Sequence, residues 1–250
     1  MRYFPCLYFM RWRSSIVVNT YNVDTMRVHA LPWVLNAKLG PAVVVDPQFL
    51  HSQFFAGLLL SDGHLYKTYK VTHNSAFSLE MKWGDPGLSM VVSTFTLLKS
   101  AGLATGNFVE RKRTAEVKPN VEQSYGVAYG YSLRHALFTD LRHIWYPNGY
   151  KIVPGCVKDY LSPVCLYTWF AGDGNARGAG VEFNTQSFQH DDVLFLADIL
   201  LTKYQLQSEI QTEGKGYVIV LKQKAARQFA GLIHTLVPTC YSYKLKHLRN

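Results

Sequence analysis

The feature that most constrains this chain is a pattern that occurs twice. Residues 54–66 read FFAGLLLSDGHLY, and residues 166–178 read LYTWFAGDGNARG. In both copies an apolar run long enough for a helix ends at an Asp-Gly pair, Asp62-Gly63 and Asp173-Gly174. The C-terminus of a helix is the negative end of its dipole, so a carboxylate there is unfavourable without a partner. One such pair is typical of a turn, but its repetition in matching context indicates a shared role.

The segments around the two Asp-Gly pairs also follow one order. Helix starts precede the apolar runs at Asp46-Pro47 and at Ser162-Pro163. Strand-like sequence follows at 64–83 and 180–188, and amphipathic helices follow at 85–103 and 190–206. Each half then has a strand pair and a closing helix, at 107–117, 123–133 and 133–146 in the first and at 207–213, 215–223 and 224–237 in the second. The order therefore predicts helix, two strands, helix, two strands and helix, twice.

We therefore predict an α+β fold of two pseudo-symmetric αββαββα halves, residues 46–155 and 156–250, after an N-terminal extension of residues 1–45. A central pair of packed motif helices is expected to join them.

Small residues four positions apart support that packing. Gly57 and Ser61 share one helix face, and Thr168 and Gly172 share the other, which allows two backbones to approach closely. Helices packed through these faces bring the two Asp-Gly pairs together at one end.

Two carboxylates at adjacent helix ends repel each other, and a divalent cation relieves that repulsion. Mg²⁺ is commonly bound by one or two carboxylates, water and substrate phosphate oxygens. We therefore predict a Mg²⁺ site at Asp62 and Asp173, to which the carbonyl oxygens of Ser61 and Gly172 can add ligands.

Composition limits the class of partner. The chain has 26 basic and 17 acidic residues and a net charge of +9, which favours a polyanion partner. Its four cysteines include no CxxC pair, so neither a disulfide framework nor a zinc site is expected. No apolar run approaches the ~20 residues of a membrane span. The absence of acidic residues before Asp24 is similar to an organellar transit peptide, with a basic tail as the alternative.

The two motifs resemble those of single-chain LAGLIDADG homing endonucleases. Residues 55–63 (FAGLLLSDG) and 166–174 (LYTWFAGDG) are the motif copies, and the resemblance extends over about residues 46–246. It is strongest in the second half, through GVEFNTQSF, GYVIVLKQKAARQFAGLI and VPTCYSYKL. Leu60 and Ala171 replace the first acidic position of the motif, whereas its last aspartate is present in both copies.

The resemblance implies a monomer whose two antiparallel sheets form a saddle over the DNA major groove. It implies hydrolysis of both strands at a long asymmetric target, with two or three Mg²⁺ ions for which Mn²⁺ substitutes. Asp62 and Asp173 carry over as metal ligands. Gln186 matches a polar residue near the nucleophilic water, and counting from Phe77 gives Glu80 as its counterpart. Lys151 and Lys244 match basic residues beside the scissile phosphates.

The strand regions also carry basic and amide side chains that can address phosphates and base edges. The first half offers Lys67, Lys70, His73, Asn74, Lys82, Arg111, Lys112, Arg113 and Lys118. The second half offers Asn175, Arg177, Asn184, Ser187, Lys215 and Lys222. We interpret the tyrosines of the segment YGVAYGYS mostly as sheet packing.

Three functions are compatible with these features. The leading interpretation is a Mg²⁺-dependent, site-specific DNA endonuclease of intron homing, acting in a mitochondrion or chloroplast. The alternative is an RNA maturase on the same fold, which binds intron RNA and assists group I splicing. A structural nucleic-acid-binding protein explains the charge but leaves the duplicated aspartate unexplained.

Overall fold

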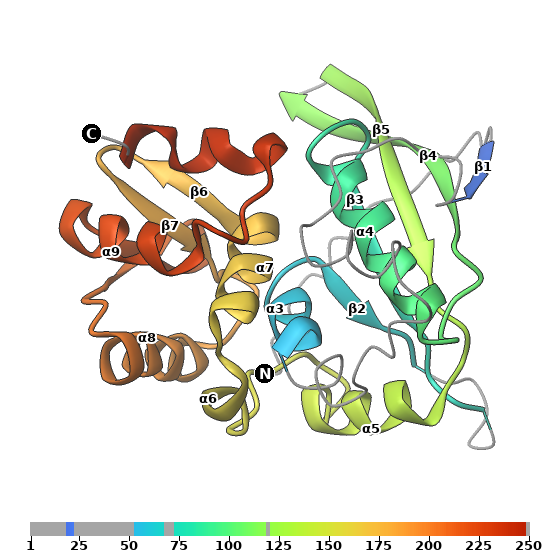
Figure 1. Cartoon of the computed structure of the whole chain (residues 1–250), viewed down its shortest axis with the longest axis horizontal. Coiled ribbons are helices and arrows are strands. Elements are labelled where there is room, and N and C mark those ends of the chain that lie inside the picture. Colours follow the sequence, from blue (N-terminus) through green and yellow to red (C-terminus); the bar gives the residue numbers. More distant parts are fainter. Residues whose placement is uncertain (1–18, 23–52, 68–72, 119–120, 249–250) are drawn as a thin grey trace, which may run out of the picture.

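The computed structural model describes residues 19–22, 53–67, 73–118 and 121–248 (Figure 1). The predicted helix start at Asp46-Pro47, the candidate Lys70 and most of the predicted extension 1–45 lie outside these ranges. Within them, the chain is α+β and each half carries one antiparallel sheet, as the repeat predicts.

The first half has the predicted order of elements. Its elements are α3 (Phe55–Leu60), β2 (Gly63–Leu65), β3 (Phe77–Lys82), α4 (Gly87–Ser100), β4 (Asn107–Lys118), β5 (Val121–Tyr131) and α5 (Ala136–Trp145). The region 64–83, expected as one strand region, is divided into β2 and β3. A further strand from the predicted extension, β1 (Asn19–Asn22), pairs with β4, which gives a five-stranded sheet in the order β1-β4-β5-β3-β2.

The second half repeats this order and adds a short helix at each end. Its elements are α6 (Val157–Tyr160), α7 (Pro163–Asp173), β6 (Gly174–Arg177), β7 (Gly180–Asn184), α8 (His190–Tyr204), β8 (Glu209–Glu213), β9 (Gly216–Leu221), α9 (Gln223–Ile233) and the 3₁₀ helix η2 (Thr239–Leu248). The sheet order is β6-β7-β9-β8. Ser162 caps α7 as predicted, because its side chain accepts a hydrogen bond from the Cys165 backbone N–H.

The two motif helices, α3 and α7, lie side by side at the centre of the molecule (Figure 1). Their contact is as close as the small residues predict. A Cβ added to Gly57 would lie 1.7 Å from Thr168 Oγ1, and one added to Gly172 would lie 2.6 Å from Ser61 Oγ. The hydroxyls of Ser61 and Thr168 donate to carbonyls of their own helices, so the interface has no unsatisfied hydroxyl donor there.

Each half closes its core around three phenylalanines, one each from the motif helix, a strand and the closing helix. In the first half Phe55 and Phe77 have ring centroids 4.9 Å apart, and both contact Phe138. In the second half Phe170, Phe183 and Phe229 contact one another with centroids 5.1–5.7 Å apart. All six rings are fully buried, which fixes each sheet against its helices.

The sequence predicts neither a disulfide framework nor a membrane-spanning segment. Cys156, Cys165 and Cys240 are free thiols there, while Cys6 lies outside the described ranges. Within those ranges, no helix combines the length and the apolar character that crossing a bilayer requires.

Candidate metal centre and nucleic-acid interface

The contact between the motif helices brings the two aspartates together. Asp62 follows the C-terminus of α3, and Asp173 is the last residue of α7. A Cβ added to Gly172 would lie 2.8 Å from Asp62 Oδ2, so the Asp62 carboxylate lies against the final turn of α7. The duplicated Asp-Gly pairs therefore form one cluster, as predicted from the packing of the helices.

Two lysines bind the ends of the motif helices. Lys244 Nζ donates to the carbonyl oxygens of Gly174 at 2.7 Å, Ala171 at 2.8 Å and Phe170 at 3.3 Å. Lys151 Nζ donates to those of Ser61 at 3.0 Å and Gly63 at 3.2 Å. Each ammonium group thus offsets the negative end of the motif helix in its own half. The sequence comparison placed these lysines beside phosphates and did not predict this capping.

The four groups perturb one another's ionisation. The pKa of Asp173 is raised to about 7, mainly by burial and also by the Asp62 charge, against the opposing effect of the two lysines. Burial also raises the pKa of Asp62, although its side chain keeps an exposed side. The pKa values of Lys151 and Lys244 are lowered to about 8 by burial, against the attraction of the two aspartates. Without a bound metal, keeping these carboxylates charged therefore lowers the stability of the folded protein.

We expect Asp173→Asn to raise the melting temperature of the metal-free protein at about pH 8. An acid whose pKa rises on folding from 3.8 to about 7 loses folded-state stability as the pH rises through that window. Removing the charge should raise the free energy of unfolding by at least about 1 kcal/mol, which corresponds to a melting temperature higher by ~2–4 °C for a chain of this size. Thermal unfolding in EDTA at about pH 5 and pH 8 measures this, and an identical difference between mutant and wild type at both pH values would contradict it.

The donors of this cluster fit Mg²⁺. Within the described ranges, no group of three or more His, Cys, Asp or Glu side chains is arranged to hold a metal, so an all-protein cage is absent there. Two carboxylates with room for water and phosphate oxygens are the sparse set that Mg²⁺ accepts. The two candidate carbonyl ligands differ in whether they already accept a hydrogen bond from a lysine. The Ser61 carbonyl oxygen accepts one from Lys151, whereas Lys244 bonds to the carbonyls of Ala171 and Gly174 rather than to that of Gly172.

The sheet register corrects the predicted counterpart of Gln186. The motif glycines pair with Leu79 in the first half and with Phe183 in the second, so Leu79 and Phe183 are equivalent. Three residues further along each chain are Lys82 and Gln186. By this register the counterpart of Gln186 is Lys82 rather than Glu80, whereas a catalytic role for Glu80 stays a prediction.

Glu80 has a structural partner. Its carboxylate accepts two hydrogen bonds from Arg113, at 2.9 and 2.6 Å. Its charge also raises the pKa of Asp62, so it remains near the cluster. By the same register Glu80 is equivalent to Asn184.

One face of the first sheet, opposite its helices, gathers basic and aromatic side chains. Lys82, Arg111 and Arg113 share this face, since Lys82 and Arg111 both pair with Val127 on β5. The guanidinium of Arg111 lies 3.6 Å from the ring centroid of Tyr129. Lys112 alternates to the opposite face of the sheet and does not share this face with Arg111 and Arg113.

The tyrosines of β5 also lie on this face. That two of them are exposed was not predicted from the sequence. Tyr125 pairs with Arg113 and is 39% exposed, and Tyr131 pairs with Ser78 and is 51% exposed. Their interpretation as sheet packing was wrong for these two, and right for Tyr129, which is 7% exposed. The even spacing of Tyr125, Tyr129 and Tyr131, which places all three on one face of a strand, opposite Ala128 on the core face, was the signal available in the sequence.

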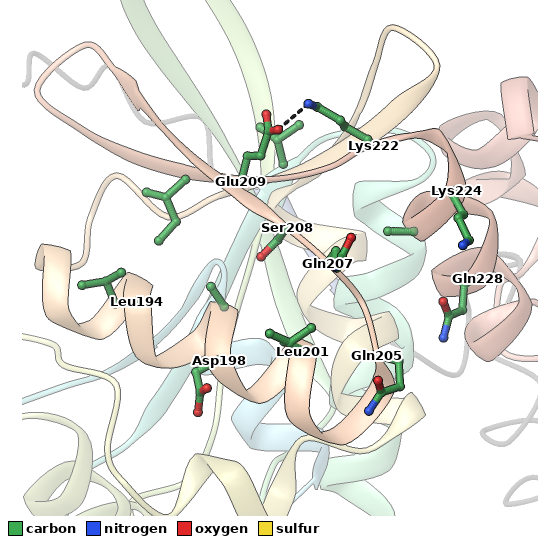
Figure 2. Close-up of a pocket in the computed structure, with 14 residues that line it drawn as sticks. Leu194, Asp198, Leu201, Gln205, Gln207, Ser208, Glu209, Lys222, Lys224 and Gln228 are labelled. Atoms are coloured by element: carbon green, nitrogen blue, oxygen red, sulfur yellow. Dashed lines mark ion pairs between the residues drawn. The ribbon is translucent and has the colours of Figure 1, made fainter.

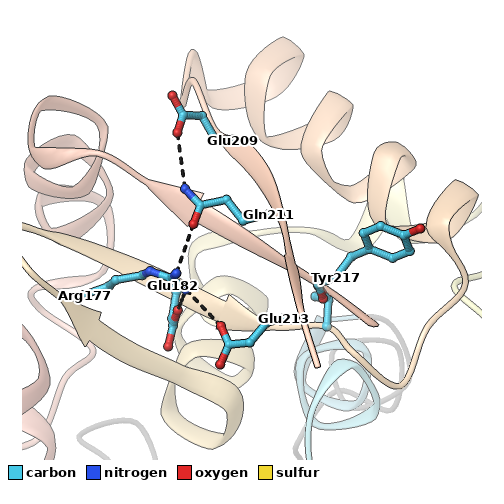
Figure 3. A network of polar contacts seen from close by, with 7 residues as sticks. Arg177, Glu182, Glu209, Gln211, Glu213 and Tyr217 are labelled. Atoms are coloured by element: carbon cyan, nitrogen blue, oxygen red, sulfur yellow. Dashed lines mark hydrogen bonds and ion pairs between the residues drawn. The ribbon is translucent and has the colours of Figure 1, made fainter. Parts of the chain in front are cut away.

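The corresponding face of the second sheet carries a polar network centred on Arg177 (Figure 3). Arg177, on β6, contacts Glu182 on β7 and both Glu213 and Gln211 on β8. Lys222 forms an ion pair with Glu209, while Asn175 lies opposite Glu182. Arg177 and Lys222, two of the basic residues predicted to contact DNA, are thus paired with carboxylates of the protein itself.

The remaining candidates lie in loops and strand ends. Lys67, His73, Ser187 and Lys215 are exposed, whereas Asn184 is partly buried at the end of β7. The side chain of Asn74 accepts from Thr139 at 3.2 Å, which ties it to α5. The side chain of Lys118 lies outside the described part of the chain.

His64 was missed by the sequence interpretation, although it directly follows the first Asp-Gly pair. Its ring nitrogen and the Tyr146 hydroxyl are 3.2 Å apart. Burial lowers the pKa of His64, and the charge of the nearby Lys151 lowers it further. The contact with Tyr146 and the effect of Lys151 place His64 near the cluster.

A groove of about 960 Å³ lies between α8, β8 and the start of α9 (Figure 2). Leu194 and Leu201 line it together with Lys222 and Lys224. None of the candidate catalytic residues lines this groove. It is separate from the metal centre, and we assign it no role.

Comparison with known proteins decides the family. Residues 52–229 match the model of the LAGLIDADG DNA endonuclease family. The chain belongs to this family. The aspartates that end its two LAGLIDADG motifs are Asp62 and Asp173, the pair at the centre of the structure.

Individual relatives match parts of the chain. The cytochrome b mRNA maturase bI2 of Debaryomyces hansenii is 32% identical over 31% of this chain and 29% of its own length. The intron-encoded endonuclease ai4 of Dictyostelium discoideum is 29% identical over 36% of this chain and 57% of its own length. The matches to curated relatives cover 23% to 57% of those relatives' lengths.

A solved structure matches over a longer stretch. The homing endonuclease I-WcaI, bound to its DNA recognition sequence, superimposes with a TM-score of 0.64 at 17% identity. The match covers 85% of this chain and 96% of that protein. This likeness establishes that the two share a fold.

Proposed function

We propose that this chain is a site-specific endonuclease of intron homing that hydrolyses both strands of a DNA target in the presence of Mg²⁺. The observation that supports it most is the pair of aspartates at the touching ends of α3 and α7, with one lysine bound at each helix end. Family membership and the shared fold support the same activity. Double-strand cleavage of a target plasmid, with and without Mg²⁺, tests it.

The proposed roles follow from the geometry. Asp62 and Asp173 hold the metal, two or three Mg²⁺ ions with Mn²⁺ as a substitute, and the Gly172 carbonyl is a freer additional ligand than that of Ser61. When bound, the metal lowers the pKa of a water and stabilises charge on the phosphate. Lys151 and Lys244 hold the helix ends and place positive charge beside the aspartates. Gln186 is proposed to position water. Lys82 holds the equivalent register position in the first half, and Glu80, bound to Arg113, lies near the cluster.

The two halves need not bind DNA in the same way. Each half supplies one sheet face, and the two faces carry different side chains, which suits a long asymmetric target and a single-chain monomer. The proposed division is residues 46–155 and 156–250, preceded by an extension of residues 1–45.

RNA maturase activity is the second candidate, because two of the matched relatives are named as cytochrome b mRNA maturases. The presence of both aspartates favours the nuclease, since RNA binding alone does not require them. Group I intron splicing assayed with the Asp62→Asn protein separates the two functions, because a maturase role should survive that change. We also propose a location in an organelle, a mitochondrion or a chloroplast, and of these two the relatives support the mitochondrion.

DNA binding is expected to weaken steeply with salt. A chain of net charge +9 that neutralises about 6–10 phosphates should lose about 10³–10⁵ in affinity between roughly 50 and 200 mM salt. Fluorescence anisotropy with labelled target duplex measures the slope of log K against log salt. An affinity that changes less than about 3-fold over this range would contradict a phosphate-binding saddle.

A further inference from the structure

Arg177 is held by three side chains from two other strands, β7 and β8 (Figure 3). Its Nη1 donates to Glu182 on β7 and to Glu213 on β8 at 3.0 Å, and its Nη2 donates to Gln211 at 3.0 Å. A guanidinium group has five N–H donors, and these contacts engage three of them. Arg177 is therefore fixed in direction, keeps two donors for another acceptor, and has a side chain that is 39% exposed.

The charge around Arg177 differs from that of the first sheet. The described strand residues on the equivalent first-half face include Lys82, Arg111 and Arg113 against one carboxylate, Glu80. The second-half network has two cations, Arg177 and Lys222, against three carboxylates, Glu182, Glu209 and Glu213. The first face therefore attracts a phosphate backbone, whereas the second is neutral to negative.

This difference restricts what Arg177 can bind. A phosphate that approached Arg177 would meet the carboxylates of Glu182 and Glu213, and like charges repel. The edge of a base carries no net charge and escapes this repulsion. In the major groove, guanine offers two adjacent acceptors, N7 and O6, to an arginine.

We propose that Arg177 is a specificity-determining residue that reads a guanine in the second half-site, while the first-half face supplies the attraction for phosphates. This rests on the proposed function, since it requires a duplex across both sheets. Glu182, Glu213 and Gln211 orient the guanidinium and exclude phosphate. Lys82 and Arg111 are the matching phosphate contacts of the first half.

Two measurements test the proposed role of Arg177. The first is target selection from a randomised duplex library without divalent metal, and the second is binding to the selected target at several salt concentrations. Arg177→Lys keeps the charge and should lose roughly 10–100-fold preference for guanine at one position. Arg177→Gln should lose the same preference with the salt slope unchanged. Lys82→Gln should instead lower the slope by about 1 and leave the base preferences intact. Lys112→Gln, on the opposite face, is the control.

Glu213→Gln tests the same idea without altering Arg177. Removal of one carboxylate should strengthen binding to random-sequence DNA several-fold and steepen its salt dependence. The inference is overturned if Arg177→Lys keeps the wild-type base preference, if Arg177→Gln lowers the salt slope as Lys82→Gln does, or if Glu213→Gln leaves non-specific binding unchanged. A wild-type protein that enriches no sequence would contradict the proposed function as well.

Discussion

Asp62→Asn and Asp173→Asn are each expected to lower the rate of double-strand cleavage at least ~10³-fold in Mg²⁺, the scale of removing a group that stabilises charge in a transition state. An amide keeps the shape of the side chain but loses the charge that binds the cation. Because the two carboxylates form one cluster, the loss of either should impair both strands. DNA affinity should stay within about 3-fold of wild type, since phosphate contacts supply most of it.

Cleavage of labelled target duplex under single-turnover conditions measures this effect, and anisotropy of the same duplex measures binding. Asp140→Asn, an exposed aspartate on α5, is the matched control and should cleave normally. Wild-type cleavage by either motif variant would refute the metal assignment. A parallel loss of DNA binding would show that the aspartates act through folding.

Lys244→Met and Lys151→Met are expected to slow opposite strands by about 10²–10³-fold each. Each ammonium group binds the end of one motif helix, Lys244 at α7 and Lys151 at α3. Methionine keeps most of the buried chain length but leaves the helix-end carbonyls and the nearby aspartate without that positive charge. The strand that is cut by the half without its lysine should therefore be cleaved more slowly than the other strand.

Supercoiled target plasmid should accumulate as open circles before it becomes linear, and strand-specific labels should show opposite nicks for the two variants. Lys246→Met, exposed and two residues beyond Lys244, serves as the control and should linearise plasmid at the normal rate. Equal slowing of both strands would show that these lysines act on the cluster as a whole and would refute the half-site assignment.

The sequence predicted the centre of the molecule well because its constraints are local. Small residues four apart on a helix permit close packing wherever the helices meet, and Gly57 against Thr168 shows that contact. The ends of the helices then carry Asp62 and Asp173 to one place. The one long-range contact that this part needs, between α3 and α7, was inferred from the repeat itself.

The sheet register was harder to predict, and the reason is geometric. Phe77 and Leu79 both point into the core, so shifting the alignment by two residues preserves the alternation of faces. Only the pairing of Leu79 with Gly63 separates the two alignments. That pairing depends on the long connection between β2 and β3, which carries no periodic signal.

Charge pairing across strands was likewise invisible in the sequence. Arg113 and Glu80 are 33 residues apart, and Arg177 and Glu213 are 36 apart, so neither pair follows from local spacing. These pairings decide which basic side chains remain available to DNA. A count of basic residues therefore overestimated the charge that the second half presents.

The most direct test of the proposed function uses the host locus from which the intron is absent. Purified protein and this DNA are incubated with Mg²⁺ and, separately, with EDTA, and the products are mapped on both strands. The proposed function predicts one double-strand break at the intron insertion site, formed in Mg²⁺ only. DNA that the protein binds at this site but leaves intact in Mg²⁺ would contradict it.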